Sequence, residues 1–204
     1  MLFTSKYKNN MVVYSDYVEV LLYDKYGHET ARVLIDLCDI QRVGRHRWYL
    51  KNGYAHNSKF NVSLHRFIMN PPDNMVVDHI NRNPLDNRRC NLRICTHTEN
   101  TRNSGLSSLN TSGFKGVYYV KEMNKYRARL RSIGESISLG YFSNPIDAAI
   151  AYDKKAIEIY GEYAFTNFDR ENYIVLDDNT VVTYSELLNI IADDDNDDFD
   201  EPAL

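Results

Sequence analysis

Short runs that alternate between hydrophobic and polar residues fill the first 65 residues, and this period is typical of β-strands. Two of the runs are VEVLLYD and ARVLID, which are separated by the turn-like segment KYGHE. Asn52 and Gly53 lie between two aromatic-rich runs, a pattern that favours a β-hairpin. The next run, NVSLHRFIM, fits either a strand or a short helix. The pattern therefore predicts a β-rich N-terminal segment.

The pattern changes in residues 76–103, which read VVDHINRNPLDNRRCNLRICTHTENTRN. Val76 and Val77 end a short strand, and a polar loop rich in Asn and Arg follows. RICTHTENTRN then predicts the end of a second strand that runs into a helix. Thr96 is a candidate N-cap of this helix, because a threonine hydroxyl can accept a hydrogen bond from the first turn. The predicted order is strand, loop, strand, helix.

A segment rich in Ser and Gly, SGLSSLNTSG, comes next, and we place a linker there at residues 104–111. Three strand-like runs follow it: FKGVYYV, KYRARLRS and SISLGYF. A helix is predicted over residues 145–160, with Asn144 as its cap, Pro145 in its first turn and Gly161 at its end. Its apolar face is predicted to pack on the sheet, and consists of Ile146, Ala149, Ile150, Ala156, Ile157 and Tyr160.

The C-terminal part is predicted to contain little fixed structure. Residues 171–192 fit a short strand pair and a helix, SELLNIIA, whereas the final DDDNDDFDEPAL is expected to be disordered. The predicted organisation is a first module at 1–103, the linker at 104–111, a sheet-plus-helix module at 112–168, and an acidic, largely disordered tail at 169–204.

Charge is divided unevenly between the body and the tail. Residues 1–170 contain all 24 Lys and Arg but 17 of the 28 Asp and Glu, a net charge of +7. Residues 171–204 contain the other 11 acidic residues and no Lys or Arg, a net charge of -11. A basic body favours a polyanionic partner. The acidic tail either lies across the basic surface and competes with the polyanionic partner, or it only aids solubility.

Several classes of protein are excluded by simple counts. No apolar run approaches the ~20 residues of a membrane helix, and the start MLFTSKYKNN lacks the apolar core of a secretion signal. The three cysteines form no CxxC pair, which argues against a disulfide framework and a cysteine-rich zinc site. No glycine-rich loop suited to a nucleotide occurs. We expect a monomer in an intracellular, cytoplasmic setting, with no membrane partner and no small-molecule substrate.

The polar segment after Val77 contains the best candidates for chemistry. In the pair Asp78-His79, the carboxylate can bind a hard divalent cation while the imidazole faces a different atom. Asn100, on the following helix, can supply a neutral oxygen to the same cation. Two oxygens with several waters suit Mg²⁺ or Mn²⁺. Asn91 can hold the imidazole, or the loop that carries it, by hydrogen bonds.

These residues resemble the HNH motif of phage and intron homing endonucleases, in the variant whose third signature residue is Asn. The resemblance covers about residues 10–103 and implies a ββα-metal fold that hydrolyses DNA phosphodiesters with one divalent cation. By position, it implies that His79 is the general base, that Asp78 and Asn100 are metal ligands, and that Asn91 orients the site. His65, in the upstream LHRFIM, is either a packing residue or a contact near the scissile phosphate.

Plainer interpretations exist for other residues of this region. His97 lies three residues before Asn100 and is interpreted as a solvated helix residue. Cys90 and Cys95 lack partners at zinc spacing and are expected to pack in the core. Two rival functions remain, a non-catalytic DNA-binding regulator with a decayed nuclease and a zinc-stabilised structural module.

Residues 112–168 resemble the APETALA-two DNA-binding domain of plant ethylene-response factors, which also occurs fused to HNH nucleases. The matching pieces are Gly116-Val117, KYRARL at 125–130, LGYF at 139–142, DAAIAYD at 147–153 and Asn167-Phe168. The resemblance implies a three-stranded antiparallel sheet that is backed by one helix and enters the DNA major groove.

Alternation in KYRARLRS agrees with such a sheet. One face has Tyr126, Ala128 and Leu130 for packing, and the other has Arg127, Arg129 and Arg131. Three Arg on one face suit phosphates or bases, although a merely solvated face is the plainer alternative. Lys115 and Tyr118 are expected to join this surface. Tyr118 and Val120 stand where the plant domains usually have Arg, so the target sequence does not carry over.

Together these observations predict an α+β protein of two modules, a ββα-metal HNH nuclease with a β-rich N-terminal segment and a sheet-plus-helix DNA reader. The predicted function is site-directed hydrolysis of double-stranded DNA with Mg²⁺ or Mn²⁺, as in a homing endonuclease. A phage-encoded protein of this kind would act in the host cell cytoplasm.

Overall fold

The computed structural model describes residues 2–4, 8–132 and 134–197, and the chain divides into two compact units, Met1–Thr101 and Arg102–Leu204. The described residues form several small antiparallel sheets and few helices, a mixed fold as predicted. Each unit has its own core of buried hydrophobic residues. The division lies close to the predicted end of the first module at residue 103. None of the described helices has the length and apolar character needed to cross a bilayer.

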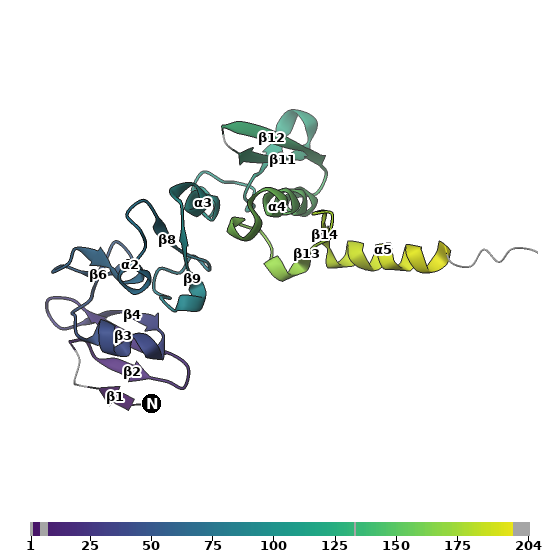
Figure 1. Cartoon of the computed structure of the whole chain (residues 1–204). Coiled ribbons are helices and arrows are strands. Elements are labelled where there is room, and N and C mark those ends of the chain that lie inside the picture. The colour runs from purple at the N-terminus through teal and green to yellow at the C-terminus, as the bar shows by residue number, and fades with distance from the viewer. Residues whose placement is uncertain (1, 5–7, 133, 198–204) are drawn as a thin grey trace, which may run out of the picture. The chain divides into compact units, whose positions relative to one another are not determined.

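The described residues of the first unit form three small sheets and short helices (Figure 1). Its sheets are the four-stranded β1-β2-β3-β4, the three-stranded β5-β6-β7 and the pair β8-β9. The bounds are β1 Leu2–Thr4, β2 Met11–Val13, β3 Val18–Tyr23, β4 Glu29–Ile35, η1 Leu37–Asp39, α1 Ile40–Gly44, β5 Tyr49–Lys51, β6 Tyr54–Asn57, β7 Val62–Ser63, α2 Leu64–Met69, β8 Val76–His79, η2 Arg89–Asn91, β9 Leu92–Cys95 and α3 His97–Arg102.

The hairpin of β5 and β6 confirms the prediction made from Asn52 and Gly53. Both residues have positive φ, 52° and 83°, as a two-residue type I′ turn requires. NVSLHRFIM forms both predicted alternatives, because a two-residue strand, β7, leads directly into the helix α2. Beside the hairpin, Trp48 is fully buried in the core of this unit, and its indole N–H donates to the carbonyl of Val43.

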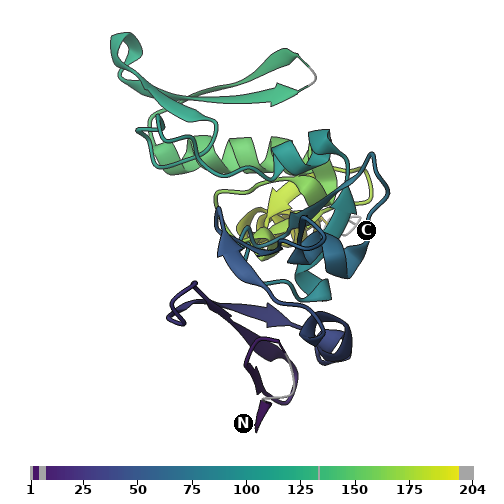
Figure 2. The same cartoon turned by 90° about the vertical axis from the view of Figure 1, so that its left-hand side faces the viewer.

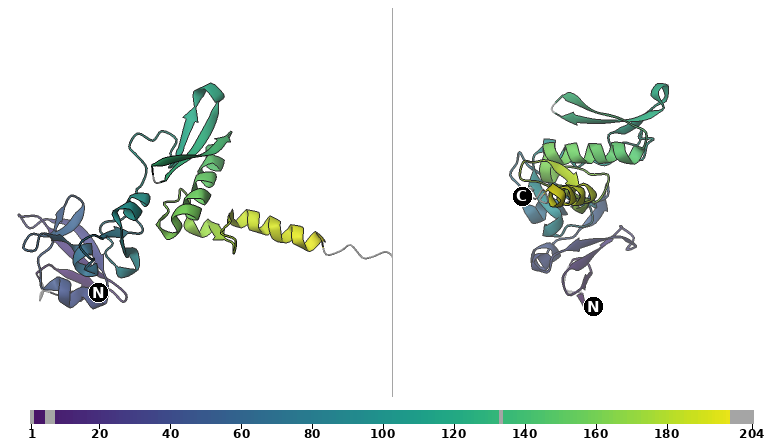
Figure 3. Two further views of the ribbon diagram at one scale, coloured as in Figure 1. Left: turned by 45° about the horizontal axis from the view of Figure 1, so that its top comes forward. Right: turned by 90° about the vertical axis from the view of Figure 1, so that its right-hand side faces the viewer.

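The second unit is built around one long helix (Figure 2). Its helix α4 lies between the three-stranded sheet β10-β11-β12 and the hairpin of β13 and β14, and α5 leads away from that hairpin (Figure 3). The bounds are β10 Val117–Val120, η3 Lys121–Met123, β11 Lys125–Ser132, β12 Glu135–Phe142, α4 Pro145–Tyr160, η4 Gly161–Tyr163, η5 Arg170–Asn172, β13 Tyr173–Val175, β14 Val181–Thr183 and α5 Tyr184–Asp197.

Helix α4 begins and ends where the sequence predicts. The Asn144 side chain accepts a hydrogen bond from the Ile146 amide, Pro145 is the first helical residue, and Gly161 follows the last. The buried face differs at one end from the prediction. Ile146 is 46% exposed, whereas Tyr152, which the prediction left out, packs with Ala156 and Tyr160 against Leu130 of the sheet.

A buried carboxylate ties α4 to the segment that follows it. Asp153 has no exposed surface and accepts hydrogen bonds from the backbone and side chain of Asn167, the Phe168 amide and the Tyr173 hydroxyl. Each of these donors compensates part of the cost of burying the charge. This anchor holds Asn167 and Phe168 against α4.

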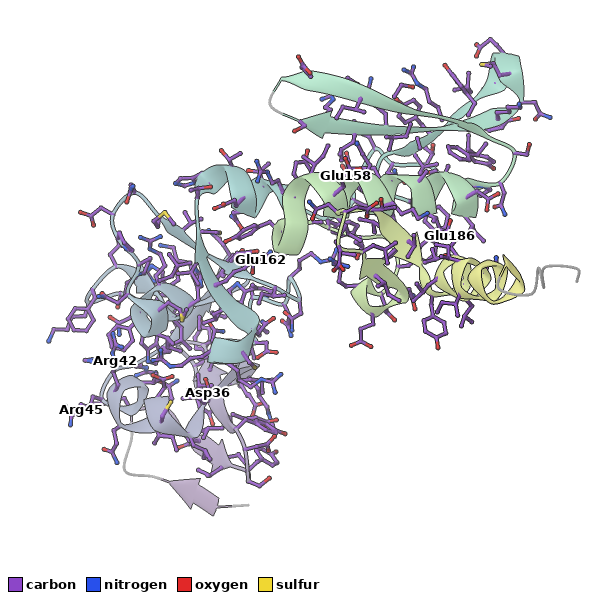
Figure 4. The ribbon with its side chains drawn as sticks, turned by 45° about the vertical axis from the view of Figure 1, so that its right-hand side comes forward. Asp36, Arg42, Arg45, Glu158, Glu162 and Glu186 are labelled. Atoms are coloured by element: carbon purple, nitrogen blue, oxygen red, sulfur yellow. The ribbon has the colours of Figure 1, made fainter. Side chains whose placement is uncertain are left out.

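The prediction of a largely disordered tail at residues 169–204 is wrong for the described residues. The strand pair and helix expected within 171–192 are present, and α5 continues to Asp197. Ile157, Tyr173 and Val181 share a core cluster, so the hairpin packs on α4 instead of remaining in solvent. Glu186 of α5, labelled in Figure 4, also pairs with Lys154 of α4 at 2.7 Å. The expectation for residues 198–204 lies outside the described residues.

Candidate active site and nucleic-acid interface

The strand pair β8 and β9 positions the two residues predicted to carry the chemistry. Asp78 lies opposite Arg93, and His79 lies opposite Leu92. Both Asp78 and His79 are 6% exposed. Successive residues of a strand point to opposite faces, so the carboxylate and the imidazole have different surroundings.

The His79 imidazole is surrounded by aromatic rings. The His65 ring of α2 lies 4.9 Å away between centroids with its plane at 72°, and the Tyr54 ring of β6 lies 6.0 Å away. His65 and Tyr54 are themselves 5.4 Å apart. Tyr54 is 41% exposed whereas both histidines are buried, so this tyrosine forms the solvent side of the cluster.

Burial favours the neutral form of both histidines. Burial lowers the pKa of His79, and the nearby Asn87 side chain and the charges of Asp78 and Asp86 raise it again in part. Burial lowers the pKa of His65 to about 3, with further lowering by the charge on His79. A neutral imidazole at neutral pH can accept a proton, which is the state that a general base needs.

Asp78 is held by Arg93 from the neighbouring strand. Its Oδ2 accepts hydrogen bonds from Arg93 Nε at 3.0 Å and Nη2 at 2.7 Å. The Arg93 side chain is 11% exposed, so this is a largely buried charge-assisted contact. It fixes the direction of the carboxylate that the sequence predicts to be a metal ligand.

Asn91 fastens the loop between β8 and β9. Its Oδ1 accepts from the Asn81 amide at 2.9 Å, and its Nδ2 donates to the Asp86 carbonyl at 2.8 Å. The sequence left open whether Asn91 holds the imidazole or the loop, and these two bonds are to the loop.

Asn100 lies on α3 and is exposed. Thr96 caps this helix as predicted: its hydroxyl accepts from the Glu99 amide, and the Glu99 carboxylate accepts from the Thr96 amide. His97 is exposed, in line with its interpretation as a solvated residue. Asn100 therefore offers its side-chain amide oxygen from the helix that directly follows β9.

A second group of potential metal ligands occurs among the described residues, formed by Asp36, Cys38 and Asp39. Arg89 already donates hydrogen bonds to the carboxylates of this group. The Arg89 amide donates to Asp36 Oδ2 at 2.7 Å, and the guanidinium donates to both oxygens of Asp39. This chemistry fits an ion pair better than a cation site. Among the other cysteines, Cys95 is buried as predicted, whereas Cys90 is exposed and the expectation that it packs in the core is wrong.

The sheet of the second unit has a basic, aromatic face. Arg127 lies between Tyr118 and Tyr141 in register, with its guanidinium 5.6 Å from the Tyr141 ring centroid. Arg129 lies 5.4 Å from the Tyr118 ring, and Arg131 is exposed. Ala128 and Leu130 between them are buried. The alternation predicted for this strand is therefore present, and the guanidinium groups of Arg127 and Arg129 lie over tyrosine rings.

The Lys115 side chain is engaged by groups outside β11, and its expected place on the DNA-binding surface stays a prediction. Its Nζ donates to the carbonyls of Arg102 and Ser104 and lies 4.6 Å from the Phe165 ring centroid. An ammonium engaged by two backbone carbonyls would have to give up these bonds to contact DNA.

Three residues near His79 and Asp78 were missed by sequence reasoning. Arg93 could have been found, because an antiparallel pairing of the two predicted strands places it opposite Asp78. Tyr54 and Asn87 gave no such signal, since their proximity to His79 depends on elements that are distant in the chain.

Comparison with known proteins identifies the family. Residues 70–102 match the family described as HNH endonuclease. A protein named uncharacterized HNH endonuclease L560, from Acanthamoeba polyphaga mimivirus, is 34% identical over 133 residues, which is 61% of this chain and 68% of that protein. The chain therefore belongs to the HNH endonuclease family, and it is a DNA endonuclease.

Two further relatives match shorter parts of the chain. Protein 3.8 of Escherichia phage T7 is 36% identical over 64 residues, 31% of this chain and 53% of that protein. The ethylene-responsive transcription factor WRI1 of Arabidopsis thaliana is 36% identical over 75 residues, 36% of this chain but 17% of that protein. The chain thus resembles both an endonuclease and, over a shorter length, a plant transcription factor.

Proposed function

We propose that this endonuclease is of the homing type, in which an HNH module cuts double-stranded DNA and a sheet-type module selects the site. The observation that carries this proposal is the buried His79, biased to its neutral form and adjacent to Asp78, within the segment that matches the HNH family. A neutral imidazole in that position is suited to take a proton from water. The viral and phage relatives favour action inside a host cell.

In the proposed mechanism, His79 accepts a proton from water while the water oxygen forms a bond to phosphorus and the bond from phosphorus to the leaving oxygen breaks. His65 packs against His79 and contacts the phosphate with its neutral ring. Asn91 holds the loop that follows His79, and Arg93 fixes Asp78.

Asp78 and Asn100 are the proposed ligands of one divalent cation. Their donors are a carboxylate and an amide oxygen, and hard oxygen donors are the chemistry that Mg²⁺ or Mn²⁺ prefers. When bound, such a cation polarises the phosphate and stabilises the leaving oxygen. Tightly held zinc is not expected, because no cysteine contributes to this donor set.

Loss of either ligand is expected to weaken metal activation of cleavage. Asp78→Ala and Asn100→Ala should each need more Mg²⁺ than the parent chain, and Mn²⁺ should restore part of the activity. The measurement is the rate of plasmid cleavage against metal concentration, with EDTA as the zero point. Nicked and linear products separate by migration, so the same gel reports how many strands are cut.

His97→Ala is the matched control, since His97 lies on the same helix three residues earlier and is also exposed. It should retain the parent's metal dependence. An unchanged dependence in both ligand variants removes the metal assignment, and a change in His97→Ala alone moves it to that residue.

The second unit is the proposed DNA reader, of the APETALA-two type. Support comes from the three-stranded sheet backed by α4, from the Arg127 and Arg129 face, and from the match to a plant protein named as a transcription factor. Arg guanidinium groups can donate hydrogen bonds both to phosphates and to the edges of guanine bases. We propose that Tyr118 belongs to this face and that the reader binds as a monomer.

Removing Arg127 and Arg129 together is expected to weaken DNA binding and its salt dependence. Each phosphate contact that is lost should reduce the slope of log affinity against log salt by about one. An arginine that reads guanine should instead cost roughly 1–3 kcal/mol at one base position. The measurement is a DNA titration at several salt concentrations.

The control removes the same charge elsewhere in the unit, with Lys155→Ala and Arg170→Ala. If the Arg127 and Arg129 double variant binds with the parent's affinity and slope while retaining its fold, the strand is not the DNA face.

A further inference from the structure

The loop between β8 and β9 is docked on the N-terminal sheet. Leu34 of the edge strand β4 donates its amide to the Leu85 carbonyl at 2.8 Å and accepts from the Asn87 amide at 2.8 Å. A parallel bridge joins Leu34 to Asp86 between these bonds. The loop therefore continues the sheet for one residue, and the backbone of Asn87 is fixed by a strand that lies about fifty residues earlier.

A second tether lies two residues further along the loop. Arg89 forms a bidentate pair with Asp39, with Nε to Oδ2 at 3.0 Å and Nη2 to Oδ1 at 2.8 Å. Its backbone amide donates to Asp36, labelled in Figure 4, at 2.7 Å. The Asp39 side chain is 4% exposed, so this is a shielded, geometrically defined contact. Both tethers come from the segment that follows β3.

The direction of the Asn87 side chain follows from its partners. Asn87 is 1% exposed, and its Nδ2 donates to the Pro84 carbonyl at 3.0 Å. A carbonyl can only accept, so the NH₂ end of the amide must face Pro84. The oxygen end then faces the other way, and the nearness of the Asn87 side chain raises the pKa of His79. Asn87 Oδ1 is buried and accepts no hydrogen bond from the described residues, so it is an acceptor that a donor on the imidazole would satisfy.

We propose that Asn87 is a positioning residue that holds His79 in one tautomer, and that β4 and the Arg89 pair with Asp39 hold Asn87 in place. This inference rests on the proposed role of His79 as general base. The N-terminal sheet then contributes to the nuclease centre, because it fixes the loop that contains Asn87.

The consequence is chemical. An amide oxygen only accepts hydrogen bonds, so the imidazole nitrogen that faces Asn87 must carry the proton. The other nitrogen then keeps its lone pair, and that lone pair is the one available to take a proton from water. Without the acceptor the two neutral tautomers would interchange, and only one of them has a basic nitrogen at the reacting side.

Nitrogen-15 NMR of the full chain with labelled histidine tests the first half of this inference. The signals of His79 are assigned by their loss in His79→Gln. In the parent chain above neutral pH, one nitrogen should have the shift of an N–H and the other that of a bare nitrogen. Averaged shifts for the two nitrogens overturn the proposal, and this outcome requires no variant that could fail to fold.

Two substitutions then test whether Asn87 acts as a hydrogen-bond acceptor or only fills space. Asn87→Leu keeps the volume but removes the oxygen, and should average the two His79 shifts and lower kcat on the order of 10²-fold with little change in KM. Asn87→Asp keeps an acceptor, and should keep one tautomer and stay within about tenfold of the parent's kcat.

The matched control is Asn9→Leu. Asn9 is 3% exposed in the same unit, and among the described residues its side chain bonds only to main-chain groups of Leu21 and Trp48. This variant should lose stability without a change in the His79 tautomer. If Asn9→Leu averages the His79 shifts as Asn87→Leu does, or if Asn87→Leu leaves them unchanged, the proposal is overturned. If the tautomer responds as expected but His79→Gln cleaves DNA at the parent's rate, the positioning is real and the general-base role is what fails.

Discussion

Replacing His79 with alanine is expected to lower the rate of DNA cleavage by ~10²-fold or more, because general-base catalysis typically contributes that much. DNA affinity should remain nearly that of the parent, since the proposed binding face is in the other unit. The substitution removes the acceptor for the water proton but leaves Asp78 and its pairing with Arg93 in place. The measurement is single-turnover cleavage beside a binding titration on the same DNA.

His79 is buried beside His65, so loss of fold has to be separated from loss of chemistry. Trp48 is the chain's single tryptophan and lies in the core of the same unit, so its fluorescence reports the folding of that unit. His28→Ala is the matched control, because the His28 side chain is 78% exposed and lies in a distant turn. A folded His79→Ala that cuts at the rate of the parent would falsify the assignment.

Replacing Gly116 with alanine is expected to destabilise the second unit by about 3 kcal/mol or more. Gly116 has a φ of 76°, a conformation that costs an L-residue free energy. A Cβ there would also lie 2.0 Å from Tyr152 Cδ2 and 2.8 Å from the Arg129 carbonyl oxygen. Tyr152 is 4% exposed against the sheet, so its ring has little room to move away. DNA affinity should fall as the sheet loses its support from α4.

Thermal unfolding followed by far-ultraviolet circular dichroism and by Trp48 fluorescence tests this prediction. A loss of 1 kcal/mol lowers the Tm of a unit of this size by roughly 4–8 °C. The circular dichroism transition should therefore shift by more than about 10 °C, while the Trp48 transition, which reports the first unit, stays in place. Gly113→Ala is the control, since Gly113 has a φ of 81° but no atom within 4 Å of an added Cβ. Equal shifts in the two variants would show that the overlap with Tyr152 contributes nothing.

The sequence by itself determined the elements whose signals are local. Asn144, Pro145 and Gly161 set the bounds of α4, and Asn52 with Gly53 set the first hairpin, because caps and tight turns depend on one or two residues. Alternation within β11 predicted which side of the strand the arginines occupy, since a strand has a period of two. The spacing of the motif likewise predicted the family before any comparison.

Tertiary structure decided which elements distant in the chain come into contact. The proximity of His65 and Tyr54 to His79 and the docking of the Asn87 loop on β4 arise from packing in the first unit. Packing in the second unit likewise brings the Lys115 ammonium to two backbone carbonyls. The strands β13 and β14 are ordered for the same reason, because Tyr173 and Val181 are buried against α4. Periodicity and caps record only neighbours within a turn or a strand, whereas these partners are selected by burial and hydrogen bonding once the chain has folded.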